Sequence, residues 1–551
     1  MEKKKTFIII VVALLVLSIG ITFAYFIAKT GPGASANANV TTGTVDDLKF
    51  NVSKENISLN INQFNFASGS GNITDTVTAT ASLKANSTKN TATYNYYVYF
   101  QIESNNYVYT TTDKKPEIVL SITGPNGEIT SVDGLKYVTA TNADGTVVKG
   151  FDITTLGNSI TRIANAFEIS STSSTDYTNQ DWVFKVSFIN LDTNQANNEG
   201  KTLTGKVLIQ SNKLIDSVSD VAKSGDNLVT AIQNLSTKSK PSYTGLYHHD
   251  ASLTNGAEDN SYRFAGANPN NYVCFGSDEA TCPTENLYRI IGVIDGKVKL
   301  IHAYGATTEM LGTDGGYINT ASGNKMPSQN YKGSGDLSKI GVYNWNKTGD
   351  NTWSTSTTNT TNLNKKFLAY LDGKNTKWKT MIADTTWYVG GMTLTNGNYS
   401  NAKTAYDYEV GANKDANTTV TSKIGLMYVS EYYYGASKDY WTLPGRDQYG
   451  FWRFAVWMGN DYSKAKNDNW MCTGLYEWTI SRCAFQGPNQ AFGVVDIGFV
   501  YDMTANYAGY VLRPSFNLTS SVKYELGDGT AVNPIRIKLW LVDYACLGRN
   551  G

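Results

Sequence analysis

Histidine, proline and cysteine are scarce in this chain, and the scarcity bears on its function. The 551 residues include 3 histidines, 5 cysteines and 11 prolines. No histidine precedes His248 and no His-Glu-x-x-His sequence occurs, so a zinc peptidase site in the first part of the chain has no support. The low proline content argues against a stalk that spans a cell wall.

Net charge is absent as well. Lysine plus arginine and aspartate plus glutamate each number 47, and charged residues make up only 17% of the chain. Because no basic run occurs after the first few residues, we do not expect nucleic acid to be a partner. Glycine, asparagine, threonine, serine and tyrosine are abundant, which is typical of exposed β-rich surface proteins.

One long apolar run stands at the beginning of the chain. It covers Thr6–Ala28 and is long enough to cross a bilayer as a single helix. Three lysines precede it, which predicts a cytoplasmic N-terminus and an extracellular C-terminus. Residues 1–30 are therefore predicted to be a cytoplasmic stub and a signal-anchor in the cell membrane. A cleaved signal peptide is the alternative, because small residues at Ala34–Ala38 offer cleavage positions.

Residues 40–212 show short segments in which apolar and polar residues alternate. Turn sequences rich in glycine and asparagine separate them, and this pattern predicts an antiparallel β-sandwich. The clearest segments are Thr76–Ala81, Tyr94–Phe100, Ile118–Ile122, Val183–Phe188 and Gly205–Gln210. Because this part contains no cysteine, we expect its core alone to stabilise it.

Residues 213–242 change to helical spacing, which predicts a two-segment helical linker. Residues 243–539 then form the second predicted domain, with α+β structure, and 540–551 form a tail. Strands are expected at Leu287–Val293, Lys297–Ala303, Ile424–Val429 and Tyr440–Leu443, with a helix near Leu363–Leu371. The polar stretches 351–362 and 396–421 are expected to be surface loops. The predicted fold class is thus mainly β with an α+β head.

The cysteines support export from the cell. Cys274 and Cys282 are close in sequence, as are Cys472 and Cys483, and no Cys-x-x-Cys occurs. We expect two local disulfides, Cys274–Cys282 and Cys472–Cys483, the second across a hairpin that contains Trp478. Cys546 is left over in the tail.

The most informative stretch is 472–522, which contains EWTISR, AFGVVDIGF and VLRPSFNL in that order. Together with LYRIIGVIDGKVKLI and KIGLMYVSEYYY upstream, it resembles the C-type-lectin-like modules of secreted bacterial surface proteins. Those modules also close with a tryptophan-bearing strand, a loop and an Arg-Pro strand. The chain departs from calcium-dependent lectins, because Gly487-Pro-Asn489 stands where they carry Glu-Pro-Asn or Gln-Pro-Asp. Calcium-dependent sugar binding is therefore not implied by the resemblance.

The first part carries a second resemblance. An apolar export segment, followed by Asn39-Val-Thr-Thr-Gly-Thr-Val45 and a β-sandwich, is similar to the camelysin and biofilm-fibre subunits of Gram-positive bacteria. Camelysin is a peptidase, but the chain has none of the zinc-binding histidines that such an activity needs in this region.

No catalytic constellation is found elsewhere. His248 and His249 are adjacent and point to opposite faces if their segment is extended, and His302 stands alone. Ser520-Ser-Val-Lys523 matches a β-lactamase motif, but its partner motifs are missing or out of order. We therefore assign no catalytic residue, no metal site and no cofactor.

Trp441, Arg446, Tyr449, Trp470, Trp478 and Arg482 are the candidate ligand residues. Trp478 and Arg482 fall in a predicted strand, where a structural role is expected. Function concentrates on loops, so the predicted ligand-binding residues are Tyr449, Trp470, Gln486 and Asn489.

The sequence therefore predicts a membrane-anchored surface protein that uses its lectin-like head in adhesion or recognition of a glycan or a protein. A fibre or matrix subunit assembling through the sandwich and an exported enzyme are the alternatives.

Overall fold

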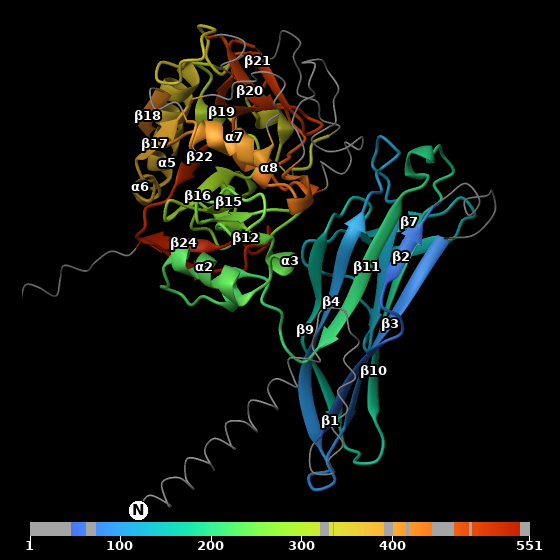
Figure 1. Cartoon of the computed structure of the whole chain (residues 1–551). Coiled ribbons are helices and arrows are strands. Elements are labelled where there is room, and N and C mark those ends of the chain that lie inside the picture. Colours follow the sequence, from blue (N-terminus) through green and yellow to red (C-terminus); the bar gives the residue numbers. More distant parts are fainter. Residues whose placement is uncertain are drawn as a thin grey trace, which may run out of the picture. The chain divides into compact units, whose positions relative to one another are not determined.

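The structure is a computed structural model that describes residues 46–61, 73–319, 330–333, 335–390, 401–414, 418–442, 468–483, 488–507 and 509–539. These residues form mostly β-strands in several antiparallel sheets, with fewer helices, as the sequence predicts (Figure 1). The chain divides into two compact units. The first is Met1–Thr154 with Ile160–Lys213, and the second is Thr155–Ser159 with Leu214–Gly551.

The predicted membrane anchor and the predicted tail both lie outside the described residues. No helix in the part of the chain that the structure describes is long and apolar enough to cross a bilayer.

The first unit consists of two antiparallel sheets. The larger has the strand order β1-β3-β10-β5-β8-β7, with β6 paired to β5, and the smaller has the order β2-β11-β4-β9. All five segments that the alternating pattern predicts as strands are found, within β3, β4, β5, β10 and β11. The strands are β1 (Asp47–Val52), β2 (Ile57–Asn60), β3 (Ile73–Lys84), β4 (Ala92–Asn105), β5 (Ile118–Gly124), β6 (Gly127–Glu128), β7 (Tyr137–Thr141), β8 (Val147–Asp152), β9 (Ser159–Ser171), β10 (Thr178–Phe188) and β11 (Thr202–Gln210), with the short helix η1 (Ala196–Asn198) between β10 and β11.

Aromatic side chains join the two sheets face to face, as in a β-sandwich. Phe100 of β4 stacks on Phe184 of β10, with ring centroids 5.9 Å apart. Trp182 of β10 is buried, and its Nε1 donates to the hydroxyl of Tyr96 of β4 over 2.8 Å. Gly124 lies against the Trp182 ring, where a Cβ would come within 2.8 Å of a ring carbon. The contacts of Phe100 with Phe184 and of Tyr96 with Trp182 hold the two sheets together without a disulfide.

A buried carboxylate also stabilises this unit through hydrogen bonds. Glu117 is fully buried at the start of β5, and its side chain accepts hydrogen bonds from Thr110, Gln195 and Asn198. These donors come from two loops that are far apart in sequence, so one side chain ties both loops to β5. A hydrogen-bonded buried carboxylate of this kind stabilises the unit in addition to its apolar core.

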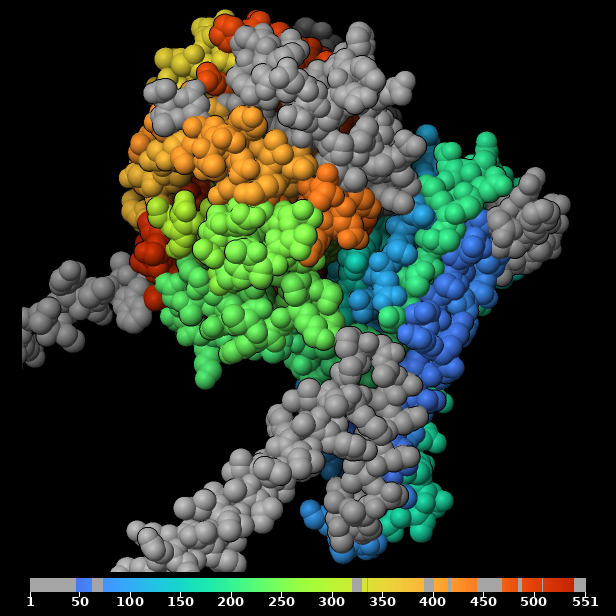
Figure 2. Space-filling view, in the orientation of Figure 1, coloured from blue at the N-terminus to red at the C-terminus, as the bar shows by residue number. Residues whose placement is uncertain are grey.

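The second unit contains a six-stranded antiparallel sheet in the order β12-β13-β15-β16-β22, with β14 paired to β15, and three smaller sheets, β19-β20-β21, β17-β18 and β23-β24. Segments distant in sequence lie side by side on its surface, green beside orange and red in Figure 2. The strands are β12 (Leu246–His249), β13 (Ser261–Phe264), β14 (Tyr272–Cys274), β15 (Leu287–Ile294), β16 (Lys297–His302), β17 (Thr385–Tyr388), β18 (Thr419–Ser422), β19 (Glu477–Cys483), β20 (Gln490–Val494), β21 (Val500–Thr504), β22 (Ser515–Asn517), β23 (Val522–Leu526) and β24 (Arg536–Leu539).

The helices of this unit are short. They are η2 (Val218–Asp220), α2 (Leu228–Lys238), α3 (Pro241–Thr244), η3 (Thr284–Asn286), α4 (Thr308–Leu311), η5 (Leu337–Lys339), η6 (Thr358–Phe367), α5 (Leu368–Lys374), α6 (Thr376–Thr380), α7 (Ala402–Glu409), α8 (Val429–Tyr434) and η8 (Lys438–Tyr440).

The predicted linker belongs to the compact body of the second unit. Its later half forms α2, which begins after the N-cap Asn227 and buries Leu228, Ile232 and Leu235 in the core of this unit. Of its earlier half, only Val218–Asp220 is helical, as a single turn. The apolar residues at helical spacing in the predicted linker therefore pack in the core of the second unit.

Two segments predicted as surface loops contain buried helices, so that prediction is wrong. Residues 358–367 form the π-helix η6, in which Asn359 and Asn362 are buried. The Asn362 amide donates to the carbonyls of Leu311 and Asp314, and its oxygen accepts the N–H of Gly316. Buried asparagines that are fully hydrogen-bonded can line a core, although their composition resembles that of a loop. In the stretch 396–421, α7 buries Ala402 and Ala405.

Two of the predicted strands in this unit are also wrong. Residues 424–428 make only an isolated bridge between Gly425 and Ser515, and α8 begins at Val429. Near residue 440 the chain forms the helical turn η8. The strands predicted at Leu287–Val293 and Lys297–Ala303 are present as β15 and β16.

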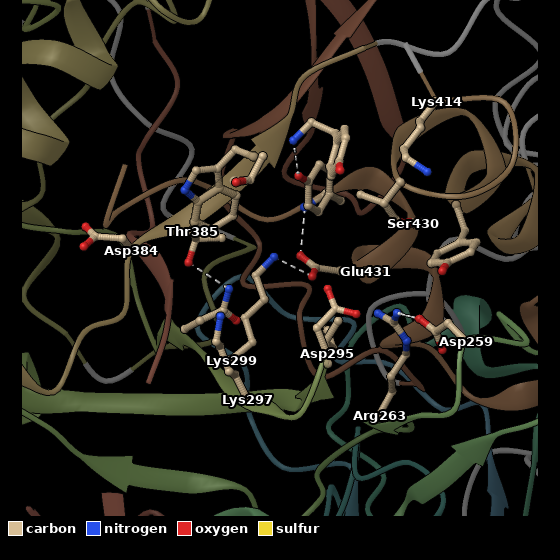
Figure 3. A pocket seen from close by; sticks show the side chains of 18 residues that line it. Asp259, Arg263, Asp295, Lys297, Lys299, Asp384, Thr385, Lys414, Ser430 and Glu431 are labelled. Atoms are coloured by element: carbon tan, nitrogen blue, oxygen red, sulfur yellow. Dashed lines mark hydrogen bonds and ion pairs between the residues drawn. The ribbon is translucent and has the colours of Figure 1, made fainter. Parts of the chain in front are cut away.

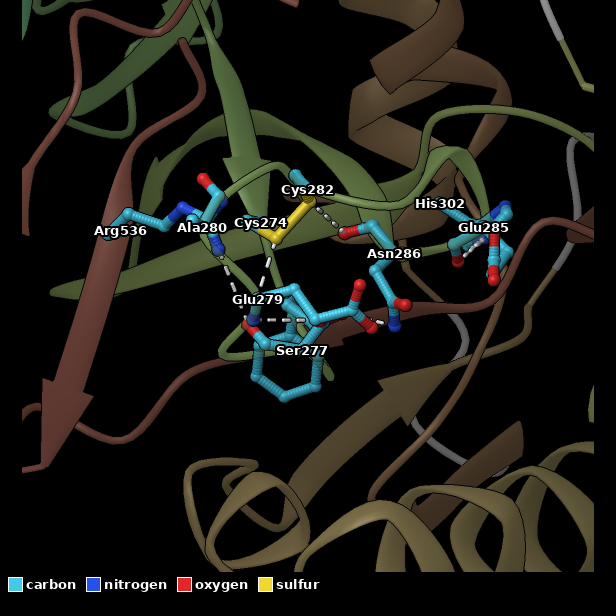
Figure 4. The surroundings of a disulfide bond; sticks show 10 residues. Cys274, Ser277, Glu279, Ala280, Cys282, Glu285, Asn286, His302 and Arg536 are labelled. Atoms are coloured by element: carbon cyan, nitrogen blue, oxygen red, sulfur yellow. Dashed lines mark hydrogen bonds between the residues drawn. A yellow bond between two sulfur atoms is a disulfide. The ribbon is translucent and has the colours of Figure 1, made fainter.

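One of the two expected disulfides is present. Cys274 of β14 is bonded to Cys282 (Figure 4). The predicted Cys472–Cys483 bond is not formed, and both of these cysteines are buried thiols. The prediction assumed a hairpin around Trp478, whereas 477–483 is the continuous strand β19. A strand of seven residues extends roughly 20 Å, which carries Cys483 away from the turn that holds Cys472. Cys546 lies outside the described residues.

Candidate functional site

A cavity of about 460 Å³ lies within the second unit (Figure 3). Its walls come from β13, the β15–β16 hairpin, β17, α7, α8 and β22, so segments from most of the unit converge on it. Four aromatic side chains line it: Trp387, Tyr388, Tyr406 and Tyr428. Eight lining residues are charged: Asp259, Arg263, Asp295, Lys297, Lys299, Asp384, Lys414 and Glu431.

Local sequence features set the edge of this cavity. Asp295 and Gly296 both have positive φ, 49° and 67°, which is the geometry of a two-residue hairpin loop between β15 and β16. This tight turn fixes Asp295 and Lys297 at the end of the hairpin. Lys297 and Lys299 are two residues apart on β16, so they project from the same face of the strand.

A buried ion pair joins Lys299 to Glu431 across the cavity floor. The Lys299 Nζ lies 2.6 Å from Glu431 Oε1, and both side chains are less than 5% exposed, at 4% and 3%. The ammonium also lies 4.8 Å from the Trp387 ring and 4.7 Å from the Tyr428 ring. Burial lowers the pKa of Lys299, although the charge of Glu431 opposes that shift. The lysine is thus held by an acid and by two aromatic faces.

Glu431 is positioned by the helix to which it belongs. At the start of α8 it accepts the backbone N–H of Tyr428 over 2.9 Å, which forms a capping box. The same carboxylate therefore caps the N-terminus of α8 and holds Lys299.

A second ion pair stands beside the first. The Arg263 guanidinium lies 2.6 Å from Asp259, and its Nε donates to Ser261 over 2.8 Å. The rings of Tyr406 and Tyr434 face Arg263 at 5.7 and 5.6 Å. Burial alone would raise the pKa of Asp259, but the Arg263 charge and the hydrogen bonds from Ser261 and Arg263 together outweigh it and lower the pKa to about 2. The pair remains ionised at neutral pH.

Glu409 of α7 lies behind the cavity wall and caps the same helix, α8. Its carboxylate accepts the N–H groups of Val429 and Ser430 over 3.0 and 2.9 Å, and the hydroxyl of Ser481. Burial raises the pKa of Glu409 to about 7, although its hydrogen bonds to Ser430 and Ser481 oppose the shift. The helix that carries Glu431 is therefore anchored through a carboxyl group that titrates near neutral pH.

Replacing Glu409 by glutamine is expected to change how stability depends on pH. Because the pKa of Glu409 is about 7 in the folded state against 4.5 for the ordinary group, its protonation stabilises the fold below pH 4.5, and this contribution is lost as the pH rises through 7. Relative to Glu409→Gln, the wild-type protein should lose about 3 kcal/mol of unfolding free energy between about pH 4.5 and 8. Denaturation curves of both proteins across this range test this, and a constant difference would contradict it.

The histidines have packing roles. His248 and His249 point to opposite sides of β12, as expected, with His248 half-exposed and His249 buried. His249 Nδ1 accepts the N–H of Ala257 over 3.0 Å, and its ring packs against Tyr434 and Trp441. Burial, followed by the nearby Arg263, keeps the pKa of His249 well below its usual value.

Of the predicted ligand residues, the structure describes Trp470 and Asn489, and neither of them lines the cavity. Trp470 is buried, its Nε1 donates to the carbonyl of Phe264, and Arg289 lies 4.6 Å over its ring. Asn489 is exposed in the segment before β20. Tyr449 and Gln486 lie outside the described residues, as does Arg446.

Two other candidates are built into the core. Trp441 is buried, with its Nε1 donating to the carbonyl of Ala436. Trp478 is fully buried in β19, while Arg482 near the end of that strand is half-buried.

The sequence did not indicate the cavity residues, because the spacing of the lysines is that of a strand with one face in solvent. In Lys297-Val-Lys-Leu-Ile, the two lysines alternate with apolar residues, which is the pattern of a strand with one solvated face. Lys299 is nevertheless buried, and its partner Glu431 is 132 positions away in the sequence. The one local signal is Glu431 itself, whose position at the start of a tyrosine-rich helix fits a capping role.

No protein-family model, no curated protein and no solved structure matches this chain. Within the described residues, no group of three or more histidine, cysteine, aspartate or glutamate side chains has the arrangement of a metal site.

Proposed function

We propose that this protein is an exported bacterial surface protein, anchored in the membrane by Thr6–Ala28, whose second unit is a lectin-like head for recognition of an extracellular ligand. The observation that carries the proposal is the cavity, whose volume of about 460 Å³ falls in the range of small-molecule sites, about 300–1,000 Å³. Its floor is fixed before any ligand arrives, because Lys299–Glu431 is a buried ion pair and Arg263 of the pair Arg263–Asp259 is buried. Prearranged polar groups reduce the cost of ordering on binding.

Other features support the lectin-like assignment and the exterior location. In the second unit the tryptophan-bearing strand β19 is followed by β20 and β21 and then by Arg513-Pro514, which leads into β22. A tryptophan-bearing strand that precedes an Arg-Pro strand is part of the order on which the sequence resemblance rests. The Cys274–Cys282 disulfide suits an oxidising exterior. The chain is proposed to act by binding and to need no cofactor.

Intact cells that produce the full chain offer the direct test. Such cells, overlaid on arrays of glycans and proteins, should bind at least one ligand, and protease added outside the cells should abolish that binding. The variant Thr386→Trp places a large ring at an exposed position of the cavity wall, so it should weaken binding more than about tenfold. Thr380→Trp, at an exposed position outside the cavity lining, is the matched control and should bind normally.

Three outcomes would contradict the proposal. The first is ligand binding that survives treatment of the cells with protease. The second is that no ligand on the arrays binds, and the third is that Thr386→Trp binds as well as the wild type.

A further inference from the structure

Lys299 and Glu431 differ from the other lysine–carboxylate pairs in the described part of the chain, because both of their side chains are buried, at 4% and 3% exposure. In each of the other pairs the lysine is at least 21% exposed. Two charges that are withdrawn from water lose much of their hydration, and their mutual attraction offsets that loss only in part. Burial therefore favours a product in which neither group is charged.

The two groups are also held in position to react. The Lys299 Nζ lies 2.6 Å from Glu431 Oε1, and the side chains point toward one another in Figure 3. The rings of Trp387 and Tyr428 flank the ammonium at 4.8 and 4.7 Å. The other carboxylate oxygen, Oε2, accepts the N–H of Tyr428 over 2.9 Å. Groups that a fold aligns in this way reach effective concentrations of about 10⁵–10⁸ M, which favours a condensation that water would otherwise reverse.

The protonation of Lys299 points the same way. Burial lowers the pKa of Lys299, although the charge of Glu431 opposes that shift. A buried lysine therefore reaches its neutral form, which is the nucleophile, more readily than a lysine in water does. The proton has an acceptor at hand, because Nζ donates a hydrogen bond to Glu431 Oε1. Its transfer gives a neutral amine beside a carboxylic acid.

We propose that Lys299 and Glu431 condense to an intramolecular amide that cross-links β16 to α8. The Lys299 nitrogen forms a bond to Glu431 Cδ, and the bond from Cδ to Oε1 breaks. Oε1 leaves as water with two of the three ammonium protons, and the third remains on the amide nitrogen. Oε2 becomes the amide oxygen and keeps the hydrogen bond from Tyr428. The reaction needs no other reactant, and it takes place within the second unit, so it does not depend on the proposed function.

The cross-link has a consequence for the unfolded chain. It joins two residues that are 132 positions apart, whereas the Cys274–Cys282 disulfide joins residues 8 positions apart. Closing a longer loop removes more conformational freedom from the unfolded chain. The amide also withstands reducing agents, so it holds the cavity floor together under conditions that open the disulfide.

Peptide mapping of the purified full-length protein tests this bond without any substitution. Trypsin cuts after a free lysine but not after one whose nitrogen is part of an amide, so Val298–Lys325 should remain uncut at Lys299. This peptide should be joined to Ile424–Lys438, which contains Glu431. By mass spectrometry the branched peptide should weigh one water molecule less than the two peptides together. Most molecules should carry it, and reduction should not split it.

Lys206 and Glu103 are the matched internal control. Their Nζ and Oε1 atoms are also 2.6 Å apart, but the side chains are 21% and 34% exposed. In the same digest these two residues should occur in separate linear peptides, because water solvates both charges.

Two variants assign the donor. Lys299→Arg keeps the positive charge, but a guanidinium stays protonated and does not attack a carboxyl group, so the branched peptide should be lost. Lys206→Arg should retain it. The melting temperature shows whether Lys299→Arg is folded, and the wild-type peptide map decides the proposal in either case.

Cleavage after Lys299 in most wild-type molecules, with Glu431 in a linear peptide, would overturn the proposal. A branched peptide that persists in Lys299→Arg would mean that another lysine is the donor. Attachment of Lys299 to Thr404–Lys414, which contains Glu409, would mean that Glu431 is the wrong acid. A second branched peptide between Lys206 and Glu103 would show that burial does not drive the reaction.

Discussion

Replacing Arg513 by methionine is expected to lower the unfolding free energy of the second unit by about 3–5 kcal/mol, because it leaves a buried carboxylate without its counter-charge. Arg513 is 0% exposed and its partner Glu477 is 2% exposed, with Nη1 lying 3.2 Å from Glu477 Oε2. The same guanidinium donates to the carbonyls of Met471 and His302 over 3.0 and 2.8 Å. One side chain thus ties β19 to β16, two strands of different sheets.

The size of this loss should depend on pH. Burial raises the pKa of Glu477 to about 7, and Arg513 opposes that shift. Without Arg513 the neutral carboxyl is favoured further, so Arg513→Met should be less destabilised at low pH, where Glu477 is protonated, than at about pH 8. Removing both charges, in Arg513→Met with Glu477→Met, should recover part of the loss.

Urea denaturation followed by tryptophan fluorescence measures this effect, because 10 of the 11 tryptophans lie beyond residue 213 and the signal therefore reports the second unit. Lys538→Met is the matched control. Lys538 and Glu525 are 3.6 Å apart but 44% and 42% exposed, and a surface pair of this kind is worth about 0–1 kcal/mol. Arg513→Met within about 1 kcal/mol of the wild type would contradict the structural role of the buried pair.

The first unit was predictable because several of its strands expose one face. In β3, buried residues alternate with exposed or half-buried ones from Val77 to Lys84, and the sequence alternates in the same way. Period-two hydrophobicity reports this arrangement directly. The pairing order of the strands is a different matter. β1 pairs with β3 while β2 pairs with β11, and no local pattern encodes such distant partners.

The second unit was harder to predict because its core contains many polar side chains. Asn362 and Ser356 are fully buried and hydrogen-bond to main-chain groups. By composition these residues belong to a loop. Hydrophobicity does not predict the burial of polar side chains whose atoms are satisfied by hydrogen bonds. The same reason explains why the cavity was missed, since its residues are recognisable only after β16, α8 and β13 have come together. The Cys472–Cys483 prediction failed because sequence separation says nothing of whether the intervening chain turns back.

Replacing Trp478 by alanine is expected to cost about 3–5 kcal/mol of unfolding free energy, as for truncation of other fully buried aromatic side chains. Trp478 is 0% exposed, its Nε1 donates to the carbonyl of Tyr343 over 2.8 Å, and its ring stacks on Tyr510 at 4.4 Å. The variant would lose the packing area of the indole, leave a cavity, and remove the hydrogen bond to Tyr343. The melting temperature and the urea midpoint of the full-length protein should both fall.

Tyr507→Ala is the control within the same aromatic group. The Tyr507 ring lies 5.9 Å from Tyr510 but is 43% exposed, so its removal should change the unfolding free energy by less than about 1 kcal/mol. At a temperature where Trp478→Ala remains folded, ligand binding should persist, because Trp478 is not part of the cavity lining. A Trp478→Ala protein with normal stability and no ligand binding would contradict the prediction and would place recognition on the β19 sheet. The cavity beside Lys297 would then have to be abandoned as the site, since the two explanations assign recognition to different sheets of the same unit.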